Sequence, residues 1–335
     1  MNNGVQTTSG TTGFTTEHRP LGVVVGYDAS EQGTLALHYG ARAAQRRDIP
    51  LTVVTAFTIA PAVYTTLAAV PDVPEEQVKR EATEKVLDQA REYLADYPGE
   101  VHYRPAEGDA AGVLVKLSSS AQLVVVGARG RGGFLGRLLG SVSSALPAHA
   151  ECPTVVVPRS YAAVAGEGTQ RFAPSDRTEP VVVGIDGSPQ SRVAVLQAAE
   201  AAAERDVPLR LILVLPPLDS ALMWYPDMAP RGAEDTDRRA AELHEALEAE
   251  RRWVQAHYPD LEITAHVEPG DPVDVLREIS ADAQLTVVGT RGRGGVASAL
   301  LGSVSRAVLA QAAGPVMVVP PLEDERLADQ PEFTR

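Results

Sequence analysis

The sequence predicts an α/β protein that consists of two tandem doubly wound domains, each a five-stranded parallel sheet with helices on both faces. Three observations support this fold class. The chain has 335 residues, about the length of two domains. A long segment pattern occurs twice, and within each copy short Val-rich runs alternate with longer helical patterns. Runs that are apolar on both faces and separated by helices are typical of strands in a buried parallel sheet.

The duplication is clearest in two glycine-rich segments. Residues 127–143 read GARGRGGFLGRLLGSVS, and residues 289–305 read GTRGRGGVASALLGSVS, at an offset of 162. Near the start of each copy, VVVGYDAS at 23–30 pairs with VVVGIDGS at 181–188, at an offset of 158. The difference, 162 minus 158, predicts four extra residues in the second copy between its first and third strands. A unit of this length indicates a duplicated domain, because solenoid repeats are shorter.

The elements of the first copy follow from their local patterns. LGVVVGY (21–27) and LTVVTAF (51–57) read as strands, and about 31–47 reads as the helix between them. A charged amphipathic helix is predicted at about 74–95, before a third strand at 101–106.

The remaining elements complete a repeating strand–helix order. A helix is predicted at 110–120, a strand at 122–128, a helix at about 140–150 and a strand at 154–158. The second copy repeats this order from VVVGI (181–185) to VMVVP (316–320). Parallel strands require right-handed crossovers, and we expect the strand order 3-2-1-4-5 in each half.

Composition predicts the domain boundaries. The first 20 residues are rich in Thr, Gly and Asn, and the stretch after the first copy carries Pro, Gly, Ser and charge without apolar periodicity. We therefore predict a disordered tail at 1–19, a first domain at 20–159, a linker at 160–179, a second domain at 180–321 and a tail at 322–335. Each fifth strand would lie at a sheet edge, so the two domains are expected to dock edge to edge as an internal pseudo-dimer. Whether two chains associate into a homodimer is left open.

Charge and cysteine content narrow the function classes. A net charge of −14 disfavours binding to nucleic acid or an anionic membrane surface. No apolar run approaches the roughly 18 residues of a membrane span, and the amino terminus lacks the apolar segment of a signal peptide. The single Cys152 rules out an internal disulfide and favours the cytoplasm. No cluster of His and Cys predicts a structural metal site.

The glycine-rich loops predict a phosphate site. In a doubly wound sheet the loops after strands 1 and 4 face each other at the point where the winding reverses. About a dozen residues separate Gly127 from Gly140, whereas such connections usually have about 2–6. A helix that begins at Gly140-Ser141 presents free N–H groups to phosphate. Arg129 and Arg131, with Arg291 and Arg293 in the second copy, add positive charge. These features favour the polyphosphate tail of a nucleotide.

The glycine-rich loops differ from two common nucleotide-binding motifs. The chain contains no GxxxxGK[ST], and neither loop fits GxGxxG after a first strand. The spacing is Gly-x2-Gly-x9-Gly-Ser, at Gly127, Gly130, Gly140 and Ser141, and again at Gly289, Gly292, Gly302 and Ser303. This pattern resembles the universal stress protein family, in its tandem two-domain, ATP-binding branch. The resemblance covers nearly the whole chain apart from the tails and the linker.

The resemblance implies one ATP site in each half, with Mg²⁺ arriving only as a companion of ATP. The Asp after strand 1 would contact the adenosine end, a small apolar residue near the end of strand 2 would lie against adenine, and the strand 4 loop would hold ribose and phosphates. In the first half the implied residues are Asp28, Ala56, Gly108, Gly127, Arg129, Gly130, Gly140, Ser141, Val142 and Ser143. In the second half they are Asp186, Val214, Gly270, Gly289, Arg291, Gly292, Gly302, Ser303, Val304 and Ser305. The second loop has no counterpart of Arg137, so a weaker phosphate grip is expected there.

The leading functional hypothesis is an ATP-binding regulator whose nucleotide occupancy sets its conformation and is read by an unknown regulatory protein. The resemblance adds a role in stress response. No residue of the loops is an evident base for activating water, so no catalytic residue is assigned. The alternatives are a slow ATPase or adenylate-handling enzyme, and a scaffold with an empty pocket. Asp28 and Asp186 have an alternative, purely structural role as helix caps or turn residues. The alternative for the arginines is that they are solvated side chains without a ligand.

Overall fold

The computed structural model describes residues 19–59, 74–130, 139–163, 168–173, 177–216, 233–292 and 301–331. The first half contains β1 (Val23–Gly26), α1 (Glu31–Arg47), β2 (Leu51–Phe57), α2 (Glu75–Tyr93), β3 (Val101–Glu107), α3 (Ala110–Ser118), β4 (Leu123–Gly127), α4 (Ser141–His149), β5 (Thr154–Val157) and the 3₁₀ helix η2 (Gly168–Phe172). The second half contains β6 (Val181–Ile185), α5 (Pro189–Ala203), β7 (Leu209–Leu215), α7 (Ala233–His257), β8 (Ile263–Pro269), α8 (Pro272–Ile279), η4 (Ser280–Asp282), β9 (Leu285–Gly289), α9 (Ser303–Gln311), β10 (Val316–Val319) and η5 (Glu325–Asp329).

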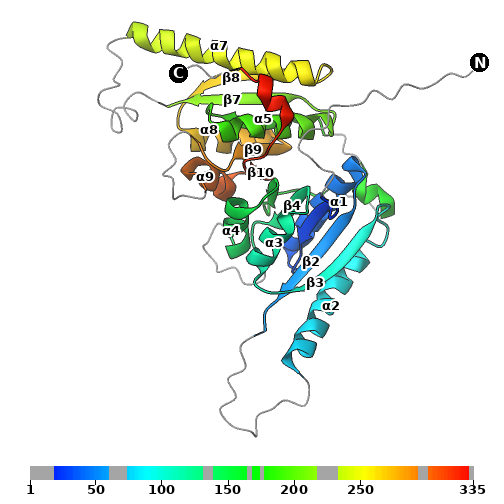
Figure 1. Ribbon diagram of the computed structural model, residues 1–335. Coiled ribbons are helices and arrows are strands. Elements are labelled where there is room, and N and C mark those ends of the chain that lie inside the picture. The colour runs from blue at the N-terminus through cyan, green and yellow to red at the C-terminus, as the bar shows by residue number, and fades with distance from the viewer. Residues whose placement is uncertain are drawn as a thin grey trace, which may run out of the picture.

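The predicted fold class is confirmed. The described strands form one ten-stranded sheet in the order β3-β2-β1-β4-β5-β10-β9-β6-β7-β8 (Figure 1), so each half has the expected order 3-2-1-4-5. Neighbouring strands are parallel within each half, and β5 pairs with β10 antiparallel, with Val156 opposite Val316. The two apolar edge strands therefore pair through their backbone groups and leave neither edge exposed, as predicted from the sequence.

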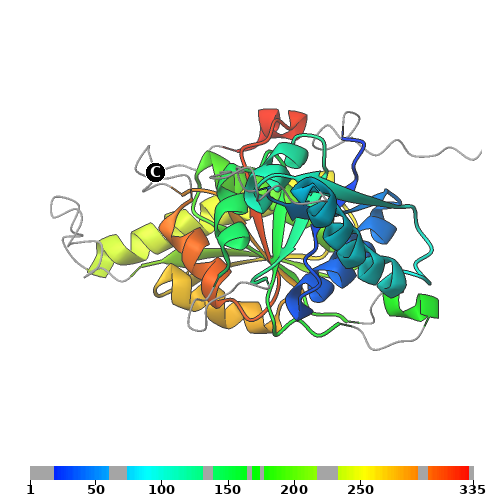
Figure 2. The ribbon, with the colours of Figure 1, turned by 90° about the horizontal axis from the view of Figure 1, so that it is seen from below.

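Helices cover both faces of this sheet (Figure 2). Buried side chains of α1, α2, α5 and α7 pack on one face, and those of α3, α4, α8 and α9 pack on the other. The strands alternate between the two cores, so that Val23 and Val25 belong to the first core and Val24 to the second. All three are fully buried, which explains why these strands are apolar on both sides.

The four extra residues of the second copy lie between its second and third strands. The second strands begin at Leu51 and Leu209, still 158 residues apart, whereas the third strands begin at Val101 and Ile263, 162 apart. The insertion therefore falls in the crossover that contains α7 and leaves the strands themselves unchanged.

Helices α1 and α5 meet where the two halves join. The guanidinium Nε of Arg47 lies 2.7 Å from Oε1 of Glu204, and Arg205 donates a hydrogen bond of 2.9 Å to the Tyr39 hydroxyl. Arg46 is held beside Arg205, and burial together with this like charge lowers the pKa of Arg46 to about 9. The seam thus combines an ion pair with a repulsive contact.

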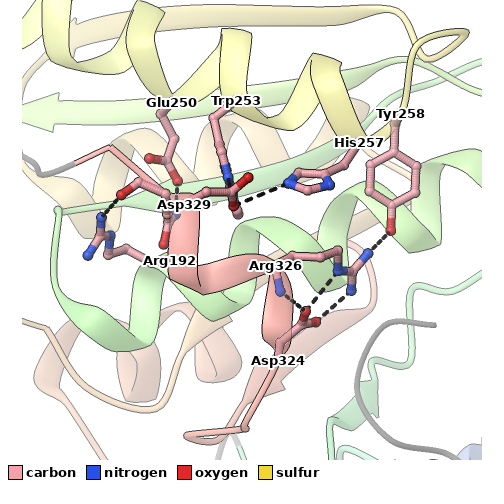
Figure 3. Close-up of polar contacts among 9 residues, drawn as sticks. Arg192, Glu250, Trp253, His257, Tyr258, Asp324, Arg326 and Asp329 are labelled. Atoms are coloured by element: carbon pink, nitrogen blue, oxygen red, sulfur yellow. Dashed lines mark hydrogen bonds and ion pairs between the residues drawn. The ribbon is translucent and has the colours of Figure 1, made fainter. Parts of the chain in front are cut away.

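The segment after each fifth strand turns back onto its own half. Residues 168–172, predicted as part of a linker, form η2, and Phe172 is buried against Tyr93 and Tyr97. One apolar residue in a polar stretch has no periodicity, so the sequence pattern could not reveal this packing. Residues 322–331, called the C-terminal strap here, contain η5 and lie along α7 and α5 (Figure 3).

Hydrogen bonds hold the C-terminal strap in place. Asp324 binds Arg326, which also donates 2.7 Å to the Tyr258 hydroxyl. Further along, the indole N–H of Trp253 donates to Asp329, and Gln330 donates to the buried carboxyl of Glu250. The strap thus belongs structurally to the second half.

Candidate functional site

The loops after the first and fourth strands meet at the carboxyl ends of those strands, as the topology predicts. In the first half, Oδ1 of Asp28 accepts hydrogen bonds from the backbone N–H of Ser30 at 3.0 Å and from its hydroxyl at 2.6 Å. The Ser30 hydroxyl in turn caps α1 by accepting from the N–H of Gly33 at 3.0 Å. Asp186 accepts in the same way from the N–H of Ser188 at 2.9 Å. The alternative role of the two aspartates as turn residues is therefore real, and Ser30 and Ser188 are the caps.

The other carboxylate oxygen of each aspartate lies against the glycine loop. A Cβ on Gly130 would stand 2.4 Å from Oδ2 of Asp28, and a Cβ on Gly292 would stand 2.2 Å from Oδ2 of Asp186. Any side chain at either position would displace the carboxylate. These glycines thus let the loop backbone press directly on the aspartate, which joins the two loops into one site.

Gly127 and Gly289 each pack closely against the first turn of a helix. A Cβ on Gly127 would stand 2.7 Å from the backbone oxygen of Gln32 in the first turn of α1. A Cβ on Gly289 would stand 3.0 Å from the backbone carbon of Gln190 in α5. The backbone of Gln32 therefore leaves no room for a side chain at Gly127, and the contact at Gly289 is tight but less severe.

The helix that follows each loop begins at the expected place. Gly140 is the N-cap of α4, and its N–H donates to Ala128 O at 2.8 Å; in the second half the N–H of Gly302 donates to Thr290 O at 2.7 Å. The first N–H groups of a helix have no partner within it, so those at the starts of α4 and α9 are suited to an anion. These starts are formed by Ser141, Val142 and Ser143, and by Ser303, Val304 and Ser305.

The third residue of each helix braces the loop. The Ser143 hydroxyl donates 2.7 Å to Ala128 O and accepts 3.0 Å from the N–H of Gly140, and the side chain is buried. The Ser305 hydroxyl donates 2.7 Å to Gly289 O. Both hydroxyls are engaged with backbone oxygens at the end of the strand and the start of the loop, whereas Ser141 is exposed at the start of the helix.

A cavity of about 460 Å³ opens between these loops in the first half. Nine of the ten residues predicted there line it, namely Asp28, Ala56, Gly127, Arg129, Gly130, Gly140, Ser141, Val142 and Ser143. Its apolar wall and floor include Val54, Leu114 and Val126, so one end is apolar and the other polar. A cavity of this size and character is typical of a small-molecule site.

Gly108 does not line this cavity. It follows β3 with φ of +135°, a conformation that side chains disfavour, and Gly270 matches it with +142°. Ala110, two residues further at the start of α3, lines the cavity in its place. Val214 occupies in β7 the position that Ala56 occupies in β2, and it packs, partly buried, against the second core.

Sequence reasoning missed several lining residues, among them Gly26, Gly33, Thr55 and Leu114. The Thr55 hydroxyl donates 2.8 Å to Tyr27 O, which fixes the end of β2 beside the loop after β1. Periodicity predicted these residues as ordinary strand and helix positions, and only their place beside the cavity distinguishes them. Arg131, Arg137 and Arg293 lie outside the described residues.

Among the described residues, no group of three or more His, Cys, Asp or Glu side chains could hold a metal ion. None of the described helices combines the length and apolar character needed to cross a bilayer. Burial raises the pKa of the Cys152 thiol to about 12, so the thiol is neutral at physiological pH and is not an activated nucleophile.

Comparison with known proteins decides the family. The Universal stress protein family matches residues 22–158 and again residues 178–320, so its pattern covers both halves. The chain belongs to the universal stress protein family. A universal stress protein of Mycolicibacterium smegmatis is 37% identical over 305 residues, covering 90% of this chain and 97% of that protein. One from Mycobacterium tuberculosis is 36% identical over 306 residues, covering 89% of this chain and 96% of that protein.

Solved structures of universal stress proteins share the fold. The crystal structure of a universal stress protein from Archaeoglobus fulgidus aligns with a TM-score of 0.61 at 19% identity and covers 89% of this chain and 96% of that one. A putative universal stress protein from Pseudomonas aeruginosa aligns with a TM-score of 0.55 at 17% identity, covering 93% and 96%. The tandem arrangement of two such domains is thus shared along nearly the full length of these chains.

Proposed function

We propose that this universal stress protein is an ATP-binding regulator of the stress response, with one ATP site in each half. Nucleotide occupancy sets the conformation of the paired domains, and a regulatory protein reads that conformation. The cavity between Asp28, the glycine loop and the start of α4 carries this proposal. Its setting is the cytoplasm, which the single cysteine favours.

The first-half cavity fits the two ends of a nucleotide. Val54, Ala56 and Leu114 form an apolar wall suited to a flat base, and the start of α4 provides N–H groups and the positive end of a helix dipole for phosphates. A Cβ on Gly140 would be 3.5 Å from its nearest neighbours, an ordinary contact distance. The protein itself therefore has room for a side chain there, and the vacant volume faces the cavity.

The proposed roles follow from position. Asp28 and Asp186 contact the adenosine end, and Ala56 and Val214 lie against adenine. Phosphates and ribose meet the loop at Gly130 and Gly292 and the helix starts. The guanidinium groups of Arg129 and Arg291 compensate phosphate charge, and Mg²⁺ enters only with ATP. Gly108 and Gly270, each with a positive φ, shape the turn after the third strand at the edge of the proposed site.

A regulator is favoured over an enzyme on chemical grounds. No side chain of the described cavity wall is a Lys or His, and the Asp28 carboxylate is already engaged by Ser30. Slow ATP hydrolysis is the alternative. The two differ in what the purified protein carries and releases.

Nucleotide content separates these functions. The protein is purified, denatured, and its supernatant resolved by ion-exchange chromatography. ATP near two per chain supports the regulator, ADP with steady phosphate release supports the enzyme, and no nucleotide, either carried or bound on addition, contradicts both.

A substitution at the helix start assigns the sites. We expect Gly140→Glu to abolish binding in the first half, because a carboxylate would fill the phosphate position with like charge. Gly302→Glu should do the same in the second half, leaving one ATP per chain in either variant and none in the double variant. Gly140→Ala is the control for loss of glycine flexibility, since its Cβ meets only ordinary contacts. Unchanged ATP content in Gly140→Glu would remove the site assignment.

The proposed domain organisation keeps the predicted domains at 20–159 and 180–321 and adds to each the segment that packs on it, η2 to the first and the C-terminal strap to the second. The pairing of β5 with β10 supports an internal pseudo-dimer. Whether two chains form a homodimer is tested by light scattering at several concentrations.

A further inference from the structure

The beginning of the first-half glycine loop is held by a side chain that no motif identifies. Gln32, in the first turn of α1, accepts a hydrogen bond of 2.9 Å from the backbone N–H of Arg129 through Oε1. The backbone oxygen of Gln32 would lie only 2.7 Å from a Cβ added to Gly127. One residue of α1 thus contacts the loop at both 127 and 129.

This contact acts on the part of the loop that lines the cavity. Arg129 and Gly130 both line it, and Gly130 rests against the Asp28 carboxylate. With the Arg129 N–H bound to Gln32, the peptide plane between 128 and 129 has one orientation. The loop therefore leaves the strand in a fixed direction before it reaches the phosphate position, which lowers the entropy lost on binding.

The second half has the same residue but not the same bond. Gln190 occupies the matching place and its backbone packs on Gly289. In the described part of the second half, no hydrogen bond joins the Gln190 side chain to Arg291. There the Ser188 hydroxyl donates to Arg291 O at 3.4 Å. In the first half the matching Ser30 hydroxyl donates to Asp28 instead, at 2.6 Å.

We propose that Gln32 is a positioning residue that pre-orders residues 127–130 for nucleotide and makes this site the tighter of the two. The proposal rests on the proposed function of both halves. Gln32 acts through the Arg129 backbone rather than by touching nucleotide, since it is not among the residues that line the cavity.

The experiment uses the full chain with one site blocked. In the Gly302→Glu background, which leaves the first site, Gln32→Met removes the acceptor while keeping the length of the side chain. The dissociation constant for ATP should rise roughly three- to tenfold, the effect of one hydrogen bond. In the Gly140→Glu background, the matched control Gln190→Met should leave the dissociation constant of the second site unchanged.

A second readout separates positioning from a general structural role. Hydrogen exchange of the Arg129 amide in the nucleotide-free protein should accelerate in Gln32→Met, with the midpoint of thermal unfolding unchanged. Gln32→Glu keeps an acceptor and should restore the slow exchange.

Each remaining outcome decides the question. An unchanged ATP dissociation constant in Gln32→Met overturns the proposal, whether or not amide exchange changes. Equal weakening by Gln190→Met overturns the asymmetry. Failure of both single-site backgrounds and of the parent protein to bind ATP would instead contradict the proposed function itself.

Discussion

The two halves of this protein close their cores in opposite ways. In the first half, η2 places Phe172 against Tyr93, Tyr97 and the imidazole of His38, so the closing contact is aromatic. In the second half, the C-terminal strap closes the same region by polar contacts, with a buried Arg326–Asp324 ion pair and a buried Glu250 (Figure 3). The duplication has kept the strand order and the glycine loops, and has let the closing segments diverge.

The difference shows which parts of the repeat are constrained by shared geometry. The loop glycines are fixed in both halves by the same close contacts with aspartate and helix. A closing segment needs only to cover apolar surface and satisfy its own polar groups, and many side-chain sets can do so. The two solutions respond differently to truncation and to pH.

The largest expected effect comes from the aromatic closure. Phe172→Ala should destabilise the protein by about 3 kcal/mol, because it removes a large, fully buried side chain. The matched change Leu327→Ala in the C-terminal strap should cost about 1 kcal/mol, since that side chain is only partly buried and hydrogen bonds also hold the strap. Urea unfolding followed by circular dichroism measures both; equal losses would show that the two closures do not differ.

The polar closure should weaken at high pH. Burial raises the pKa of Glu250 to about 7, opposed by its hydrogen bond with Gln330 and by the charge of Arg192. Because the folded state holds this proton more tightly than the unfolded chain, the contribution is full below pH 4.5 and is lost as pH rises through 7. Glu250→Gln should remove this loss, a gain of about 2 kcal/mol at pH 8. Tryptophan fluorescence during urea unfolding at pH 5 and pH 8 reports on this half, because both tryptophans, Trp224 and Trp253, lie in it; a parallel loss in the variant would contradict the assignment.

The aromatic closure should weaken in acid instead. Burial lowers the pKa of His38 to about 4, and the nearby Arg42 and Arg171 add to the shift. The folded state disfavours this proton, so the contribution is full above pH 6.5 and is lost as pH falls through 4, by about 2 kcal/mol. His38→Leu should flatten stability over that range, and the second half already has Leu196 at the matching position. The check is urea unfolding by circular dichroism from pH 7 to pH 4, where an unchanged slope would argue against His38.

The smallest expected effect compares the turns after the first strands. Ala29 has φ of +59°, where the second half has Gly187 at +73°. Left-handed backbone costs alanine about 1 kcal/mol, partly offset by its lower entropy in the unfolded chain. Ala29→Gly should therefore stabilise by less than about 1 kcal/mol, and Gly187→Ala should destabilise by a similar amount. Thermal unfolding of both variants tests whether the two turns are equivalent.

Sequence patterns predicted most of the fold because the same order of strands and helices occurs in both copies of the repeat. The helix at 31–47 and the strand at 51–57 match the structure residue for residue, and the other predicted ends of the first half lie within two residues. Hydrophobic runs and their spacing determine such elements locally. The strand order and the edge contact followed from general rules of sheet topology.

The candidate site was predicted less completely. Gly-rich spacing located the loop and the start of α4, and nine of the ten first-half residues do line one cavity. The contact of Gly127 with the backbone of Gln32 was not predicted. Gly108 lies beside the cavity rather than in its wall. Which neighbour a glycine meets depends on how a distant helix packs, and no local pattern encodes that.

By itself, the sequence determined that this chain carries two doubly wound domains with a phosphate-suited loop in each, because periodicity, duplication and glycine spacing are properties of the chain. Only the tertiary structure decided which groups hold those loops, how the halves meet at Arg47 and Glu204, and how each core is closed. These contacts join residues that are far apart in the chain. Their energies depend on distances and burial that arise only when the sheet and its helices have packed.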